Sequence, residues 1–149
     1  MELHDRVIGF MRSVLEAMEL PLDVEIVDTP DGVRVELTGE GGEHLLRRKG
    51  EALDALQTIV NSAFRRDLKD DRSFVVDCLG YRKAKDAELR QMARFMMEKA
   101  KSSGAAQEMG PLNSYARRLV HLTVAEDPEL TSESIGDAFL KTVIISLRR

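Results

Sequence analysis

The chain has 149 residues, of which 43% are hydrophobic, so it is long enough to bury one core or two smaller ones. No apolar run approaches the ~20 residues that a membrane span needs, and the first residues lack the basic and apolar regions of a secretory signal, so we expect a cytoplasmic protein. The formal net charge of −4 excludes a uniformly basic surface, although local clusters of cations can still bind phosphate.

The first half of the chain carries an amphipathic helical pattern, a strand hairpin and a second helical region. Apolar residues recur at three- and four-residue spacing from Leu3 to Leu20, and Pro21 ends that pattern. Thr29-Pro-Asp-Gly32 has the composition of a tight turn between two segments of alternating polarity. The expected elements, in chain order, are a helix over 3–20, strands over 24–28 and 33–37, helices over 43–49 and 51–68, and a strand over 73–78. The side chains expected to face a core are Val7, Phe10, Met11, Val14, Leu15 and Met18 in the first helix, and Leu53, Leu56, Ile59, Val60, Ala63 and Phe64 in the third.

The second half begins with a long helix and continues with shorter elements. Gly104 supplies the C-cap of the long helix, because glycine readily adopts the left-handed conformation that ends many helices. The expected elements are helices over 84–102 and 113–125 and strands over 105–109, 131–134 and 139–146. The side chains expected to face inward from the long helix are Leu89, Met92, Ala93, Phe95 and Met96. We place the domain boundary near Gly80, which divides the chain into residues 1–80 and 81–149, and expect the long helix to link the two halves.

Positive charge is segregated into two segments in spite of the negative total. Residues 45–66 contain five cations (Arg47, Arg48, Lys49, Arg65, Arg66) and two anions (Glu51, Asp54). Residues 81–101 contain seven cations (Arg82, Lys83, Lys85, Arg90, Arg94, Lys99, Lys101) and three anions (Asp86, Glu88, Glu98), which is also the pattern of an ordinary solvated helix face. Only 5% of the residues are aromatic and none is Trp, so a stacking platform of several exposed rings is not expected.

The residues that usually carry catalysis or bind metal are scattered. His4, His44 and His121 have none of the spacings of a zinc site, and the chain has neither a Gly-rich phosphate loop nor a nucleophile elbow. The single cysteine, Cys78, lies in an apolar run, which favours a buried thiol. Adjacent carboxylates such as Asp70 and Asp71 are expected to be solvated surface groups. We therefore expect a binding module with no cofactor and no metal, not an enzyme.

Arg117 and His121 are four residues apart on a helical pattern, in the segment Pro111-Leu-Asn-Ser-Tyr-Ala-Arg117-Arg118-Leu-Val-His121. Side chains at this spacing share one face, and an arginine beside an imidazole can bind phosphate or stack on a base. The spacing alone also suits a solvated helix face. Together with Asn113 as N-cap and the later run Thr131-Ser-Glu-Ser-Ile-Gly136, the segment resembles the single-stranded nucleic-acid-binding family named R-three-H, over residues 110–146. Ala116 departs from that family, in which a glutamate is usual.

Upstream, residues 37–61 resemble the centre of a KH domain, in which a Gly-x-x-Gly loop between two helices clamps about four nucleotides. The loop here reads Arg47-Arg48-Lys49-Gly50, so an arginine replaces the first glycine. This change either reduces access to the backbone, is offset by the three cations, or marks a KH half that contacts protein.

The two halves in this order resemble the Jag family of bacterial proteins, also called SpoIIIJ-associated proteins, over nearly the whole chain. The implied fold is α+β: a type II KH domain (α-β-β-α-α-β) followed by a small α/β R-three-H domain with a three-stranded sheet. The implied function is cytoplasmic binding of single-stranded RNA, in post-transcriptional control of cell elongation, division, shape or envelope growth. A small KH-domain protein or a second copy is the implied protein partner, and no membrane span is expected.

We expect the loop residues Arg47, Arg48, Lys49 and Gly50 to grip the backbone of the strand. In the second half, Arg117 and His121 would bind phosphate or stack on a base, with Arg118 and Lys141 as cationic support. Two alternatives stay open. The KH half could serve as a protein-interaction scaffold for dimerisation, which an apolar patch around Leu45 and Leu46 would support, or the ligand could be single-stranded DNA.

Overall fold

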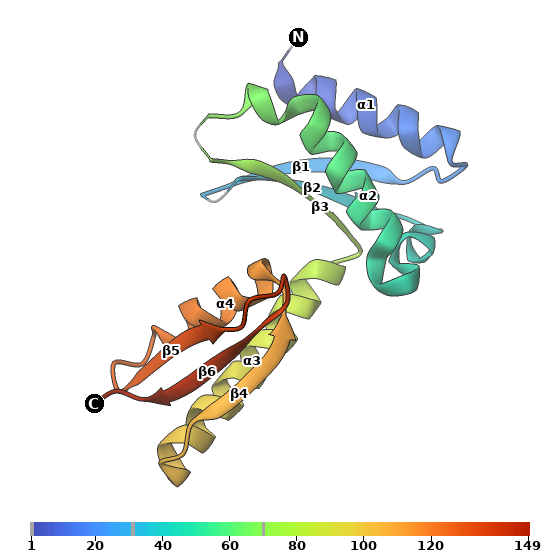
Figure 1. The fold of residues 1–149 in the computed structure, drawn as a ribbon. Coiled ribbons are helices and arrows are strands. Elements are labelled where there is room, and N and C mark those ends of the chain that lie inside the picture. The colour runs from blue at the N-terminus through green and yellow to red at the C-terminus, as the bar shows by residue number, and fades with distance from the viewer. Residues whose placement is uncertain (1, 31, 70) are drawn as a thin grey trace. The chain divides into compact units, whose positions relative to one another are not determined.

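The computed structural model describes residues 2–30, 32–69 and 71–149, so Asp31 of the expected turn and Asp70 of the acidic pair lie outside the described residues. The chain divides into two compact units, Met1–Lys83 and Ala84–Arg149, and each is described by itself (Figure 1). No helix within the described residues is both long enough and apolar enough to cross a membrane.

The first unit is a three-stranded sheet with helices on one face. Its elements are α1 (Leu3–Ala17), β1 (Asp23–Thr29), β2 (Gly32–Thr38), the 3₁₀ helix η1 (Gly42–Leu46), α2 (Arg47–Phe64), the 3₁₀ helix η2 (Arg65–Asp67) and β3 (Ser73–Cys78). The central strand β2 pairs antiparallel with β1 and parallel with β3. Both α1 and α2 contribute to a single core with alternate residues of the strands, because successive strand side chains point to opposite faces (Figure 1). The α+β class and the order of the elements are those expected from the sequence.

Several details of this unit differ from the sequence expectation. Helix α1 ends at Ala17, because Glu19 adopts a left-handed conformation (φ 61°) before the chain reaches Pro21, and Met18 is exposed. In α2 the buried stripe is Leu53, Leu56 and Val60. Ile59 and Ala63, expected to face inward, are exposed because the helix turns them away from the sheet. The short helix expected over 43–49 is a single 3₁₀ segment, η1, after which the chain leaves helical geometry.

A buried carboxylate connects the end of β3 to the start of the next helix, α3 (Tyr81–Ser103). Asp77 is fully buried, and its oxygens accept hydrogen bonds from the backbone N–H of Cys78 and of Arg82 (both 2.8 Å) and from the Arg34 guanidinium (3.1 Å). The bond from Arg82 satisfies one of the N–H groups that a helix start leaves without a partner. Asp77 therefore fixes where α3 leaves the sheet.

The second unit is an antiparallel sheet of order β4-β6-β5, with α3 and α4 packed on one face (Figure 1). Its elements after α3 are β4 (Gln107–Leu112), α4 (Ser114–Val124), β5 (Leu130–Ile135) and β6 (Lys141–Leu147). Gly104 ends α3 as expected, with φ 74° and its N–H donating to the carbonyl of Ala100 (2.9 Å).

The inward face of α3 is rotated from the expected one. Its buried residues are Ala93, Met97 and Ala100, whereas Met92 and Phe95 are 55% and 63% exposed. The expectation that Met92 and Phe95 face inward was therefore wrong. Ala93, Met97 and Ala100 join one core with Met109, Val120 and Val143, so this stripe is the one that packs against the rest of the unit.

Candidate nucleic-acid interface

The loop between η1 and the regular part of α2 presents three cations. Arg47, Arg48 and Lys49 are exposed, and Gly50 is buried. Arg47, where an arginine replaces the first loop glycine, has an extended backbone (φ −63°, ψ 152°) that any residue adopts. Arg48 (φ 53°), Lys49 (φ 59°) and Gly50 (φ 78°) are all left-handed, a conformation that costs non-glycine residues about 1–2 kcal/mol each. The loop thus holds two charged residues in a strained backbone, which is a feature typical of functional sites.

Glycine at position 50 is favoured by its surroundings as well as by its φ angle of 78°. A Cβ atom on Gly50 would lie 3.1 Å from Cε2 of Tyr81, in the first turn of α3. The Arg48 guanidinium lies as far as 4.0 Å from the Glu51 carboxylate, and the two side chains are 84% and 70% exposed. Such an ion pair contributes little in water, so the Arg48 charge is available to a ligand.

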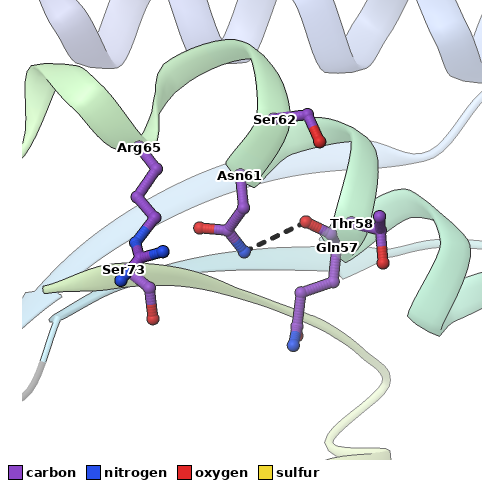
Figure 2. A pocket seen from close by; sticks show the side chains of 6 residues that line it. All are labelled: Gln57, Thr58, Asn61, Ser62, Arg65 and Ser73. Atoms are coloured by element: carbon purple, nitrogen blue, oxygen red, sulfur yellow. Dashed lines mark hydrogen bonds between the residues drawn. The ribbon is translucent and has the colours of Figure 1, made fainter.

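A polar groove of about 470 Å³ lies between α2 and the edge strand β3, lined by Gln57, Thr58, Asn61, Ser62, Arg65 and Ser73 (Figure 2). The backbone of this edge strand is already paired with side chains. Asn61 accepts from the N–H of Phe74 and donates to its C=O (both 2.8 Å). Gln57 accepts from the N–H of Val76 (3.0 Å), and Arg82 donates to the C=O of Val76 (2.7 Å). These contacts protect an edge that would otherwise be open to another strand.

Arg117 and His121 lie on α4, whose buried residues Val120 and Val124 fix the helix on the sheet. Helix α4 begins as predicted, because the Asn113 side chain accepts a hydrogen bond from the N–H of Ala116 (2.9 Å). Residues 117 and 121 are therefore one turn apart on a rigid element.

The Arg117 guanidinium joins two segments that are distant in sequence. Its Nη1 donates to the carbonyl of Leu112 at the end of β4 (2.9 Å) and to that of Phe139 before β6 (3.1 Å). An arginine has five N–H donors, and these two hydrogen bonds to described residues use Nη1 alone. Arg117 thus stabilises this end of the sheet and still offers donors to a ligand.

His121 lies between two serines of β5. Its Nδ1 is 2.6 Å from Oγ of Ser132, and its Nε2 is 2.8 Å from Oγ of Ser134. Partial burial and then the charge of Arg117 hold the pKa of His121 below its usual 6.5, so the ring is neutral near pH 7. In a neutral imidazole one nitrogen accepts and the other donates, so the ring orients both hydroxyls.

Ser132 and Ser134 are not among the site residues that the sequence predicts. Their alternate positions on one strand place them on the same face of the sheet, which is the signal that would have found them. Lys141, the first residue of β6, is paired with Leu112, whose carbonyl accepts from Arg117. Arg118 is exposed on the next position of α4. The second unit therefore brings Arg117 and Lys141 to one end of its sheet, while His121 contacts β5.

Cys78 is buried as expected, and its Sγ contacts the carbonyl of Gly42 (3.5 Å). Burial, followed by the charges of Asp77 and Glu43, raises the pKa of the Cys78 thiol to about 11. The thiol is therefore protonated and unreactive at neutral pH.

The described fold and site define a two-unit α+β protein whose second unit carries the Arg-x-x-x-His helix. Residues 87–147 match the family model of the R-three-H domain. The RNA-binding protein KhpB of Clostridium symbiosum is 30% identical over 149 residues, which cover 99% of this chain and 67% of the relative. The RNA-binding protein KhpB of Bacillus subtilis (strain 168) is 24% identical over 142 residues, which cover 94% of this chain and 68% of the relative. The chain belongs to the Jag family, in which these relatives carry the name KhpB, and the resemblance seen in the sequence is confirmed.

Proposed function

We propose that this protein binds single-stranded RNA as a binding module and not as an enzyme. The observation that carries the proposal is the exposed triad Arg47, Arg48 and Lys49, held in a strained loop next to Gly50. Charged side chains kept in an unfavourable backbone conformation contribute nothing evident to the fold, so a ligand is the simplest reason for them. The relatives named as RNA-binding proteins supply the class of ligand.

In this proposal the loop cations bind phosphates of the strand, and the backbone at Gly50 lies beside them. Arg117 binds a further phosphate with the N–H groups that do not hold the sheet, and Arg118 and Lys141 add positive potential around it. His121 donates to one of Ser132 and Ser134 and accepts from the other, and the serine that accepts keeps its hydroxyl hydrogen for a phosphate or sugar oxygen.

The alternative of a protein-interaction scaffold gains no support from Leu45 and Leu46 or from the β3 edge. Leu45 is buried and Leu46 packs against the core, so no apolar patch forms at these residues. Asn61, Gln57 and Arg82 already occupy the backbone of the β3 edge, where a second copy could otherwise add a strand. A small KH-domain partner, a cytoplasmic location and a role in cell elongation, division or envelope growth stay predictions from the family resemblance.

The test is a fluorescence-anisotropy titration with unstructured RNA and DNA of one sequence, each at several salt concentrations. Arg48→Gln with Lys49→Gln should weaken RNA binding and flatten the slope of log K against log salt by about 0.7 for each phosphate that the variant no longer binds. Arg12→Gln with Lys69→Gln removes two exposed charges elsewhere in the first unit and should leave the slope unchanged.

Two results would decide against the proposal. If the unaltered chain does not bind RNA at low salt, the function itself is wrong. If RNA binds but both pairs of substitutions change the slope equally, the loop is not the contact. Tighter binding of DNA than of RNA would support the alternative that the ligand is single-stranded DNA.

A further inference from the structure

The loop between β5 and β6 exposes an aromatic ring. Phe139 is 77% exposed, more than any other large hydrophobic side chain among the described residues, and Leu140 beside it is half exposed. Single exposed apolar residues are common on protein surfaces and need no explanation by themselves. Phe139 differs from the other exposed apolar residues in its position relative to the cations of the second unit.

The backbone of Phe139 is attached to the Arg-x-x-x-His helix. Its carbonyl accepts a hydrogen bond from Nη1 of Arg117 (3.1 Å), the nitrogen that also donates to Leu112 (2.9 Å). Two residues further on, Lys141 is paired with Leu112 across the sheet. Figure 1 shows the β5–β6 connection at the same end of the unit as the connection from β4 to α4. The exposed ring therefore belongs to a residue whose main chain is fixed beside two cations.

We propose that Phe139 stacks on one base of the strand whose phosphate Arg117 binds. This inference rests on the proposed function and extends it to the bases. A nucleic-acid strand carries phosphates and flat aromatic bases in alternation, and Arg117 with Phe139 offers a partner for each. The neighbouring cations, Arg117 and Lys141 with Arg118 on the same helix, favour an anionic strand over an uncharged apolar peptide.

The interaction is tolerant of sequence, because every base has a face that can stack on an aromatic ring. One ring suits one base, which agrees with the small number of aromatic residues in the chain. Phe139 therefore adds affinity at a single nucleotide next to the phosphate contact, without selecting which base stands there.

The experiment uses the whole chain and an unstructured RNA that carries the fluorescent base 2-aminopurine at successive positions. Phe139→Ala should weaken binding about 5- to 150-fold, which corresponds to the 1–3 kcal/mol of one stacked base. Its salt slope should be unchanged, because the variant keeps every cation that binds phosphate. The quenching of 2-aminopurine at one position should also disappear.

Three variants test the reason for the weaker binding. Phe139→Tyr keeps the ring and should retain the affinity, whereas Phe139→Leu keeps the apolar bulk without the aromatic face and should lose it. Phe95→Ala removes another exposed ring of the same unit, on α3, and should bind like the unaltered chain. Circular dichroism checks that each variant is folded.

The outcomes separate stacking by Phe139 from the proposed function. If the unaltered chain binds RNA and Phe139→Ala binds equally well, stacking is wrong and the proposed function stands. Full affinity in Phe139→Leu would also overturn stacking, since apolar contact would then be sufficient. If the unaltered chain binds no RNA, both proposals fall, and the exposed ring is then to be examined as a protein contact.

Discussion

Replacing Arg48 and Lys49 with glycine should stabilise the fold and weaken RNA binding at the same time. Both residues are left-handed, at φ 53° and 59°, which costs a non-glycine residue about 1–2 kcal/mol. Glycine removes that cost but loses about 0.4–1 kcal/mol more conformational freedom on folding. The ion pair of Arg48 with Glu51 is exposed and long, at 4.0 Å, so its loss costs almost nothing. The net expectation is a gain of about 0.5–1 kcal/mol for each substitution and of about 1–2 kcal/mol for both.

The effect on binding should have the opposite sign. If each of the two cations contacts one phosphate, the slope of log K against log salt should fall by about 1.4 in magnitude, that is about 0.7 for each contact. If the loop served folding alone, both glycines would raise the free energy of unfolding and would leave the affinity for RNA unchanged. The opposing signs therefore separate a binding role of these side chains from a structural one.

The assay is urea denaturation of the whole chain, with amide hydrogen exchange to assign the gain to the first unit, and anisotropy titrations on the same samples. A variant with glutamine at both positions is the control, because it removes the charges and keeps the strained backbone. It should lose affinity without the gain in stability. A glycine variant that is less stable than the unaltered chain would contradict the backbone strain, and one that is more stable but binds RNA equally well would contradict the binding role of these side chains.

The elements that the sequence predicts well are those fixed by residues close to one another along the chain. Asn113 caps α4 and Gly104 ends α3, because capping depends on the cap residue and the first or last turn of the helix. The hairpin of β1 and β2 follows from alternation and from a turn between the strands. Such signals need no knowledge of the rest of the molecule.

The rotation of α3 could not be predicted in the same way. Two adjacent stripes of this helix are apolar, one through Met92 and Phe95 and the other through Ala93, Met97 and Ala100. The periodicity of the sequence is compatible with burial of either stripe, and packing against the rest of the unit determines which one is buried.

The sequence predicts that Arg117 and His121 belong to the candidate site, but it does not predict their contacts. The spacing of Arg117 and His121 indicates a shared face, but their partners Phe139, Ser132 and Ser134 come from 11 to 22 residues further along the chain. The pairing of β5 with β6 determines these contacts. The sequence likewise shows that the loop cations are adjacent, but not that two of them have a left-handed backbone.

Two further changes test contacts that the fold makes across the sequence. Asn61→Ala should lower the free energy of unfolding by about 2–4 kcal/mol, because the N–H and C=O of buried Phe74 lose their partner. Ser62→Ala, on the exposed side of α2, is the control and should have little effect. Equal effects of the two substitutions in urea denaturation would contradict the role of Asn61 at the β3 edge. The last change concerns pH. The folded-state pKa of His121 lies below 6.5, so the unfolded chain binds a proton at this residue more readily than the folded chain does. The stability that neutral His121 contributes is therefore complete above pH 6.5, and it is lost as the pH falls from 6.5 toward the folded-state pKa. The unfolding free energy of the unaltered chain, measured against that of His121→Gln, should therefore decline between about pH 7.5 and 5.5. A relative gain over this interval would mean that the two serines and Arg117 favour the protonated ring, and that the neutral, hydroxyl-orienting role given to His121 is wrong.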